Sequence, residues 1–335
     1  MKPLALIGRI TQLLPVLLGV SVIVFVMMAL TPGDPVEIML ADQQATPEQV
    51  QAMRRDMGLD RPALERFGIF LGNALTGDFG LSFFHRRPVF DVIAERLPAT
   101  IELTLAALLL ALAISIPLGV VAAVKKNSIV DRLAAVGSLF GTSLPGFWFG
   151  IILIIVFAVQ FKLLPVSGRM NFACEVPPVT YLMSVDSLLR GRPDCFADAM
   201  SHLILPALTL ALPMAAVLTR VQRAAMLEVL RSDYIVFAEA KGISRHRILW
   251  RHALKNALVP TVTVAAIETG SLLGGNMVVE TVFGWPGLGR LVVESIFVRN
   301  YPLVQAAVLL YAVTYVLLNF LADVLYTLLN PRVRL

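Results

Sequence analysis

Long apolar runs alternate with more polar connections of unequal length along this chain. Six runs reach the length of about 20 residues that a helix needs to cross a bilayer; they cover 11–30, 99–123, 134–160, 202–222, 257–279 and 303–328. Several prolines lie inside these runs, and spanning helices tolerate proline where neighbouring groups satisfy the freed carbonyls. The pattern predicts an all-α membrane protein with about six transmembrane helices.

The composition agrees with a membrane protein. Of 335 residues, 57% are hydrophobic and 15% are charged, whereas a soluble domain carries about 25% charged residues. We expect three parts: a first span with a long external loop at 1–98, a spanning core at 99–328, and a tail at 329–335. The formal net charge of +5 is divided among the connections and builds no basic and aromatic face, so the expected surroundings are a bilayer, with no nucleic acid.

The distribution of charge predicts the orientation. Lys and Arg strongly outnumber Asp and Glu in the connections 124–132 and 219–256, whereas the long connections 31–98 and 161–201 together hold slightly more acids than bases. Basic connections remain in the cytoplasm. Because the predicted number of spans is even and both chain ends are basic, we expect both termini in the cytoplasm and both long connections outside.

The first long external connection carries a helix signal. Thr46 and Gln49 have the spacing of a capping box, in which each side chain bonds the backbone N–H of the other. Val50, Met53 and Met57 follow at helical spacing and form one apolar stripe.

The second long external connection holds the two cysteines of the chain, Cys174 and Cys195. In an oxidising space they would pair and stabilise this loop by about 3 kcal/mol; the alternative is two free thiols. We expect no metal, because the four histidines fall in different compartments and lack the spacing of zinc ligands: His85, His202, His246 and His252.

The inner connection 223–256 includes the stretch FAEAKGISRHRILWRHALKNALVP. A short helix is predicted up to Lys241, with Gly242 as the residue that takes the left-handed backbone at its end. Ser244 is placed to cap a second, strongly basic helix that runs on into the fifth span. Charge alone is compatible with an ordinary positive-inside loop that meets anionic lipid.

The same stretch resembles the coupling loop, or EAA loop, of permease subunits of ABC importers. In the dipeptide, oligopeptide and nickel branch its form is close to A-x-x-K-G-x9-H-x-L-[RK]-N-A, which is matched here by Ala238, Lys241, Gly242, His252, Leu254, Lys255, Asn256 and Ala257. The acid departs from the general pattern, because Val236 occupies its place and Glu239 follows three residues later. The resemblance covers nearly the whole chain, including TPGDP, SLPGFWFGI and FGWPGLGRLVVESIFVRNYPLVQ.

This resemblance implies a type I ABC importer permease fold in a bacterial inner membrane, forming half of a translocation pathway for di- or oligopeptides. It implies four kinds of partner: a second homologous permease, two ABC ATPase subunits, an external solute-binding protein and the bilayer. The expected contact with the ATPase is made by Ala238, Glu239, Ala240, Lys241 and Gly242, and the second half of the loop by His252, Leu254 and Asn256. The two alanines would allow close approach of the ATPase.

The chain is not expected to be an enzyme. The phosphate-binding sequence G-x-x-x-x-G-K-[ST] is absent from it, so this subunit would bind no cofactor, and ATP with Mg²⁺ would be held by the partner ATPases. Glu268 and Asn276 either line the pathway or merely help the spans to pack. Three alternatives stay open: the same machinery importing a nickel chelate or glutathione, an ion-coupled carrier using Glu102, Glu268 and Asp323, and a membrane scaffold without transport.

Overall fold

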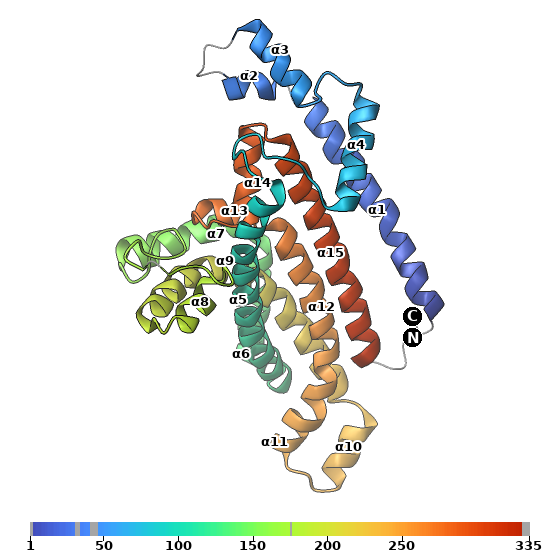
Figure 1. Cartoon of the computed structure of the whole chain (residues 1–335). Helices are drawn as coiled ribbons and strands as arrows, with labels where there is room; N and C mark the ends of the chain where they lie inside the picture. Colours follow the sequence, from blue (N-terminus) through green and yellow to red (C-terminus); the bar gives the residue numbers. More distant parts are fainter. Residues whose placement is uncertain (1–2, 31–33, 41–45, 175, 330–335) are drawn as a thin grey trace.

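The computed structural model describes residues 3–30, 34–40, 46–174 and 176–329 of the chain, and nearly all of them are helical (Figure 1). The helices include α1 (Pro3–Leu30), α2 (Pro35–Leu40), α3 (Pro47–Asp56), α4 (Ala63–Thr76), α8 (Met183–Leu189), α10 (Asp233–Ala240) and α14 (Leu288–Phe297). The remaining helices are α5 (Val89–Val124), α6 (Ile129–Ser143), α7 (Gly146–Leu153), α9 (Pro193–Val229), α11 (Arg245–Arg247), α12 (Leu254–Gly275), α13 (Met277–Val282) and α15 (Tyr301–Leu329).

Four described helices are long and apolar enough to cross a membrane: Val89–Val124, Pro193–Val229, Arg245–Leu273 and Tyr301–Ala322. A fifth span is counted if the bent pair α6 and α7, with the π-helical segment Ile154–Gln160, is taken together. The described apolar part of α1 is shorter, Pro15–Leu30. An all-helical membrane protein is therefore found as predicted, with four or five spans by length and composition among the described residues where six were expected.

The predicted span 134–160 is not one straight helix. Its two halves, Ile129–Ser143 and Gly146–Gln160, meet at an angle of 105°. The break lies at Leu144, whose backbone is extended (φ −91°, ψ 136°), directly before Pro145. A proline ring clashes with a helical backbone at the residue before it, and this clash accounts for the break.

The core of the molecule lies where α5, α9 and α12 pack together. Small residues on α5 allow this close packing: Ala99, Ala107 and Ala111 are fully buried in one cluster with side chains of α9. Helix α5 begins at Val89, so the predicted external loop 31–98 extends into the first turns of this helix. The predicted loop 161–201 likewise overlaps the start of α9 at Pro193.

The predicted capping box is present at the start of α3. The Thr46 N–H donates to Gln49 Oε1 at 2.9 Å, and the Gln49 N–H donates to Thr46 Oγ1 at 3.4 Å. The apolar stripe of Val50, Met53 and Met57 is only half-buried, because α3 lies at the outer end of the molecule, away from the core (Figure 1).

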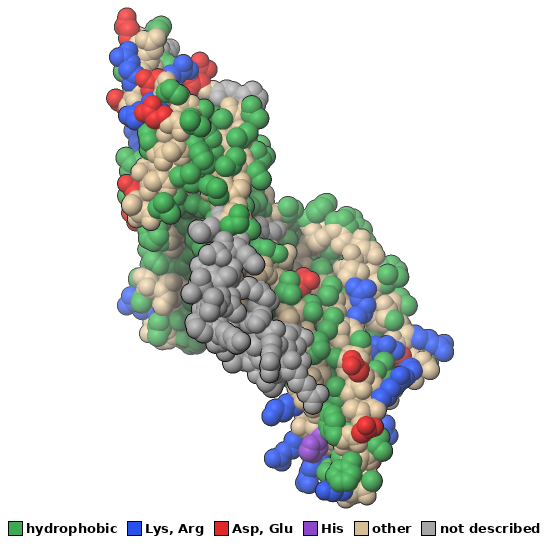
Figure 2. All heavy atoms as spheres, turned by 90° about the vertical axis from the view of Figure 1, so that its right-hand side faces the viewer, with side chains coloured by type: hydrophobic (Ala, Val, Ile, Leu, Met, Phe, Trp, Pro, Cys, Tyr) green, Lys and Arg blue, Asp and Glu red, His purple; other side chains and the backbone are tan. Residues whose placement is uncertain are grey.

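Charged side chains are unevenly divided between the two ends of the molecule. Lys, Arg and His gather at the end formed by α10 and α11, whereas acidic side chains are most frequent at the opposite end, where α3 lies (Figure 2). The exposed basic residues at the first end include Arg231, Lys241, Arg245, His246, Arg247, Arg251 and Lys255.

Candidate functional site

The extreme basic end of the molecule is made by α10 and the turn that follows it (Figure 1). Gly242 has φ +73°, in the left-handed region. Its N–H donates to the Glu239 carbonyl at 2.9 Å, and the Ile243 N–H donates to the Ala238 carbonyl at 3.2 Å. These two bonds form a Schellman motif, so the predicted left-handed glycine is found one residue after the cap itself, which is Lys241.

The chain then turns into one long helix. Ser244 occupies the predicted cap position, but its side chain makes no capping bond; its carbonyl accepts the Ile248 N–H at 3.0 Å. Helix α11 passes through the π-helical segment Ile248–Ala253 into α12 without a gap. The turn after α10 is therefore joined by continuous helix to the middle of the membrane core.

The inner face of α10 is packed against the rest of the chain. Ile235 and Ala238 are buried in a cluster with Ile248, Ala253 and Ala257, and this cluster also includes side chains from the ends of α5 and α9. Ala238 is 8% exposed. Its small side chain therefore allows α10 to approach its own chain, and the contact of Ala238 with an ATPase stays a prediction.

The outer face of α10 is apolar and exposed. Val236 and Phe237 are 57% and 61% exposed, and Lys241 Nζ lies 4.5 Å from the centre of the Phe237 ring. Glu239 and Ala240 are also exposed. A short helix that exposes aromatic and aliphatic side chains between charges has the composition of a protein-binding surface, and we call these five residues the α10 outer face.

A hydrogen bond holds α10 to the long helix. Asn256 Nδ2 donates to the Tyr234 hydroxyl at 2.7 Å and to the His252 carbonyl at 3.3 Å. Leu254 is half-buried against the cluster that holds Ala238, and His252 is half-buried as well. The second half of the predicted loop therefore fixes the position of α10, and Tyr234 is a member of the site that sequence reasoning missed.

Glu268 and Asn276, the predicted pathway residues, have different surroundings. Asn276 is 2% exposed at the junction of α12 and α13, and its Nδ2 donates to Thr104 Oγ1 on α5 at 3.1 Å. Glu268 is half-buried on α12, and in the described part of the chain no hydrogen bond joins it to Asn276. The side chain of Asp323 lies outside the described residues.

Glu102 is part of a buried ion pair that the sequence did not reveal. Arg169 Nη2 lies 2.5 Å from Glu102 Oε2, and both side chains are 8% exposed. Glu102 Oε1 accepts the Ser184 N–H at 2.9 Å, and the Arg169 guanidinium lies 5.6 Å from the Trp285 ring centre. Glu102 therefore ties α5 to the connection 161–192, a structural role that differs from the relay of the carrier hypothesis.

A second buried acid, Glu280 on α13, holds the turn that follows it. Its carboxylate accepts the Thr100 hydroxyl at 2.7 Å and the Arg290 N–H at 2.9 Å. A Cβ at Gly287 would lie 2.4 Å from this carboxylate, so the chain passes too close for any side chain there. The signal in the sequence is an acid three residues before the start of the glycine-rich stretch FGWPGLG.

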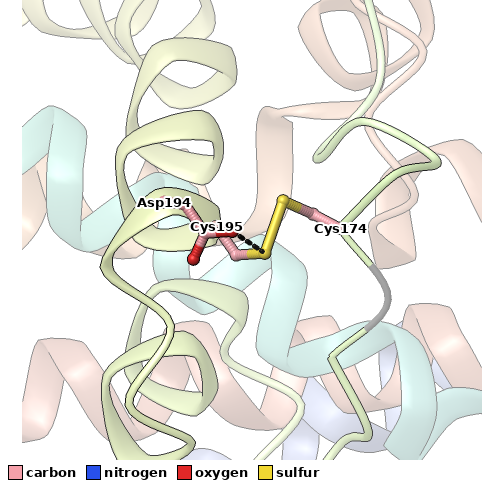
Figure 3. Close-up of side chains that lie close together, drawn as sticks. All are labelled: Cys174, Asp194 and Cys195. Carbon is pink, nitrogen blue, oxygen red and sulfur yellow. Dashed lines mark hydrogen bonds between the residues drawn. A yellow bond between two sulfur atoms is a disulfide. The ribbon is translucent and has the colours of Figure 1, made fainter.

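The connection after α7 is closed by a disulfide between Cys174 and Cys195, whose Cα atoms are 5.4 Å apart. The Asp194 carboxylate lies 3.7 Å from Cys195 Sγ (Figure 3). These three residues have the proximity of metal ligands, but the bonded sulfurs are not thiolates and do not bind metal as thiolates do. The disulfide joins the loop to the start of α9.

Asp186 on α8 organises the same connection. Burial alone would raise the pKa of this carboxyl, but hydrogen bonds from the Thr180 hydroxyl and from the N–H groups of Thr180 and Val179 outweigh it and lower the pKa. The ionised form of Asp186 is therefore the form that fits this loop.

Comparison with known proteins points to one family. Residues 115–335 match the family described as "Binding-protein-dependent transport system inner membrane component", and residues 4–104 match the N-terminal part of such components. The chain is 42% identical to the di/tripeptide transport system permease protein DppB of Pseudomonas aeruginosa strain UCBPP-PA14, over 97% of each chain. It is 40% identical to the dipeptide transport system permease protein DppB of Escherichia coli K12, over 98% of each chain.

Two further similarities extend this picture. The chain is 39% identical to the glutathione transport system permease protein GsiC of Escherichia coli K12, over 98% of each chain. Among solved structures it resembles the inward-facing MetNI methionine ABC transporter, with a TM-score of 0.52, 17% identity, and coverage of 72% of this chain and 97% of that one. At that identity the likeness is one of fold alone.

Proposed function

The chain belongs to the family of inner membrane components of binding-protein-dependent transport systems, and we propose that it is the permease subunit of an ATP-driven importer of dipeptides and oligopeptides. The observation that carries this proposal is the sequence identity of 42% and 40% to dipeptide permeases over nearly the full length of the chain. Alternating access between the two sides of a membrane needs spans that move as rigid bodies, and the long helices described above are suited to it.

In this proposal the α10 outer face docks on an ATPase subunit. Phe237 and Val236 supply the apolar area, and Glu239 and Lys241 supply charges that fix the orientation of the partner. The buried contacts of Ala238 and the Asn256–Tyr234 bond keep α10 fixed to the long helix. A displacement of α10 by the closing ATPases therefore reaches α12 through continuous helix.

The remaining parts of the machine are assigned by family membership and by charge. We assign a second permease, two ATPases that hold ATP and Mg²⁺, and an external binding protein as partners. The basic end that carries α10 faces the cytoplasm in this proposal, with both termini on that side, because basic connections are retained there. Glu268 and Asn276 remain candidates for the lining of the pathway, Glu268 because a half-buried acid in a span needs water or a partner.

Glutathione is the second candidate solute. The 39% identity to a glutathione permease is almost the same as the identity to dipeptide permeases, and glutathione is itself a tripeptide. Both candidates agree with a pathway for short peptides, and neither favours an ion-coupled carrier, because the family to which the chain belongs works with a binding protein.

Uptake by the complete complex tests the proposal. Membrane vesicles are prepared that hold the chain with its permease and ATPase partners, and the binding protein is added on the opposite side from the ATPases. They should accumulate labelled dipeptide only when ATP and Mg²⁺ are present on the side of the membrane that carries the ATPases. Excess unlabelled glutathione competes if it is the better solute. Glu239→Arg should abolish uptake without loss of the chain from the membrane. Uptake that persists without ATP, or that is unchanged in Glu239→Arg, contradicts the assignment.

A further inference from the structure

A cavity of about 490 Å³ lies between α6 and α9, next to the turn that joins α5 to α6. The lining begins at Asn127, three residues after the end of α5 at Val124. The cavity is lined by Asn127, Asp131, Arg132, Ala134, Ala135, Ser138, Thr219, Arg220 and Arg223. We call it the arginine cavity.

The charge inside the arginine cavity is only partly balanced. Arg223 is committed to the one acid in the lining: its Nε and Nη2 lie 2.5 and 2.7 Å from the two carboxylate oxygens of Asp131. Asp131 is further held by the Asn127 N–H at 2.9 Å. Neither Arg132 nor Arg220 has an ion pair with any carboxylate in the described part of the chain. The positive charges of Arg132 and Arg220, which both line the arginine cavity, are thus not balanced by an ion pair in the described chain.

The other lining groups leave room for a ligand with hydrogen-bond acceptors. Ala134 and Ala135 have the smallest side chains that a helix carries without losing stability. Ser138 and Thr219 are buried to within 4% exposure and add hydroxyl donors. A phosphate or phosphodiester group accepts such bonds together with those of arginine, whose planar fork matches its oxygens.

The surface beside the cavity is apolar. On α6, Ile129 and Leu133 are 73% and 65% exposed, next to the cavity residues Asp131 and Arg132 in sequence. Val136, Leu139 and Phe140 continue the exposed apolar surface along the helix. An arrangement of cationic side chains at the mouth and bare apolar side chains along the adjoining helix fits a molecule with an anionic head and hydrocarbon tails.

We propose that the arginine cavity binds the phosphate group of an anionic phospholipid from the cytoplasmic leaflet, with Arg132 and Arg220 as its ligands. Arg223 and Asp131 set the shape of the cavity, and the carboxylate of Asp131 balances the positive charge of Arg223. The lipid tails lie along the apolar surface of α6. This inference goes beyond transport itself and rests on one part of the proposed function, the placement of this end of the molecule in the cytoplasm.

Native mass spectrometry of the intact complex, extracted gently from membranes containing phosphatidylglycerol, tests the proposal. The unaltered complex should retain more bound phosphatidylglycerol than the double variant Arg132→Gln/Arg220→Gln. Since each charged hydrogen bond contributes on the order of 1.5–3 kcal/mol, affinity should fall about tenfold or more for each arginine removed. Lys125→Gln removes one positive charge outside the cavity lining and is the control for the single variants Arg132→Gln and Arg220→Gln. It should retain as much bound phosphatidylglycerol as the unaltered complex.

Equal retention in the double variant, or an equal loss in Lys125→Gln, overturns the proposal. A second measurement separates the sources of phosphate. The melting temperature of the lipid-stripped complex should rise with added phosphatidylglycerol and not with inorganic phosphate; a rise with inorganic phosphate alone would assign the cavity to a free anion. If the double variant instead loses the second permease at unchanged lipid count, the cavity holds a carboxylate of that subunit and the lipid assignment is wrong.

The same mass spectra keep this result apart from the proposed function. They show directly which partner chains are present, so an absence of ATPase subunits would count against the importer assignment alone. The number of bound phosphatidylglycerol molecules would then still test whether the arginine cavity binds phospholipid.

Discussion

Two alanines of α10 that are two positions apart in the sequence differ in the direction of their side chains. Ala238 is 8% exposed and packs against Ile248 and Ala253, whereas Ala240 is exposed. The motif makes them look equivalent, but one contributes to the fold and the other to a surface. Their roles in any docking must therefore differ.

Ala238→Leu should destabilise the chain, because inserting a larger side chain into a packed cluster costs about 1–3 kcal/mol. Ala240→Leu should leave the melting temperature of the solubilised chain unchanged. It should, however, weaken co-purification with the ATPase if the α10 outer face is the docking surface. A lowered melting temperature in Ala240→Leu, with Ala238→Leu unaffected, would reverse the assignment of the two faces.

Asp186 gives a pH prediction at the same scale. Its folded pKa is lowered by hydrogen bonds from Thr180 and Val179 that outweigh burial. The stabilisation is present above the unfolded pKa of about 3.9 and is lost as the pH falls through the folded pKa. Asp186→Asn should lower stability by about 1–3 kcal/mol at neutral pH. The difference in melting temperature from the unaltered chain should shrink below about pH 4; a difference that does not change with pH would contradict this account.

At the scale of the element, α10 is held less by its own helical bonds than by contacts to the long helix. A helix of eight residues is far too short to be stable alone in water. The stability that the isolated helix lacks comes from the burial of Ile235 and Ala238 and from the hydrogen bond between Asn256 and Tyr234. These contacts make α10 move with the long helix.

A double-mutant cycle measures this connection. Tyr234→Phe and Asn256→Ala should each reduce ATP-driven uptake, because the loss of a single hydrogen bond costs about 0.5–1.5 kcal/mol. The double variant should be no worse than the more severe single variant, since both remove the same bond. Thr76→Ala, on the exposed end of α4, is the matched polar truncation that should leave uptake unchanged. Strict additivity of the two losses would show that the bond does not couple α10 to the long helix.

Some features of these elements could be predicted from the sequence, and others could not. Gly242 was predictable because a left-handed helix end is a local rule about one residue. The break at Leu144 was missed because apolar periodicity outweighed the single signal of Pro145. The Glu102–Arg169 pair joins residues 67 positions apart, and no local pattern in one sequence indicates which arginine meets which acid. The inward direction of Ala238 depends on how α10 packs, which the motif does not encode.

At the scale of the whole molecule, the connection between α7 and α9 and the α10 end are built differently. The connection carries the disulfide, the Arg169 partner of Glu102 and the Asp186 loop, all of which fix backbone in place. The α10 end instead exposes Phe237 and a surplus of basic side chains. A connection fixed by covalent and ionic contacts, together with an exposed α10 end, agrees with a subunit that receives its driving force from a partner on the α10 side.

Removing the disulfide tests the structural role of the connection between α7 and α9. Cys174→Ser/Cys195→Ser should lower the stability of this connection by about 3 kcal/mol, seen as faster proteolysis between α7 and α9. ATP-driven uptake should be largely retained, because the α10 end is untouched. A variant that resists proteolysis as well as the unaltered chain but no longer transports would contradict a purely stabilising role.

The most direct test of the central claim is to extract the chain gently from its native membrane and to identify by mass spectrometry the chains that co-elute. We predict that an ATPase with the phosphate-binding sequence and a second permease co-elute with the unaltered chain, and that the ATPase is lost in Glu239→Arg while the second permease is kept. The account is contradicted if the chain elutes without an ATPase and, reconstituted alone, still moves peptide along an ion gradient.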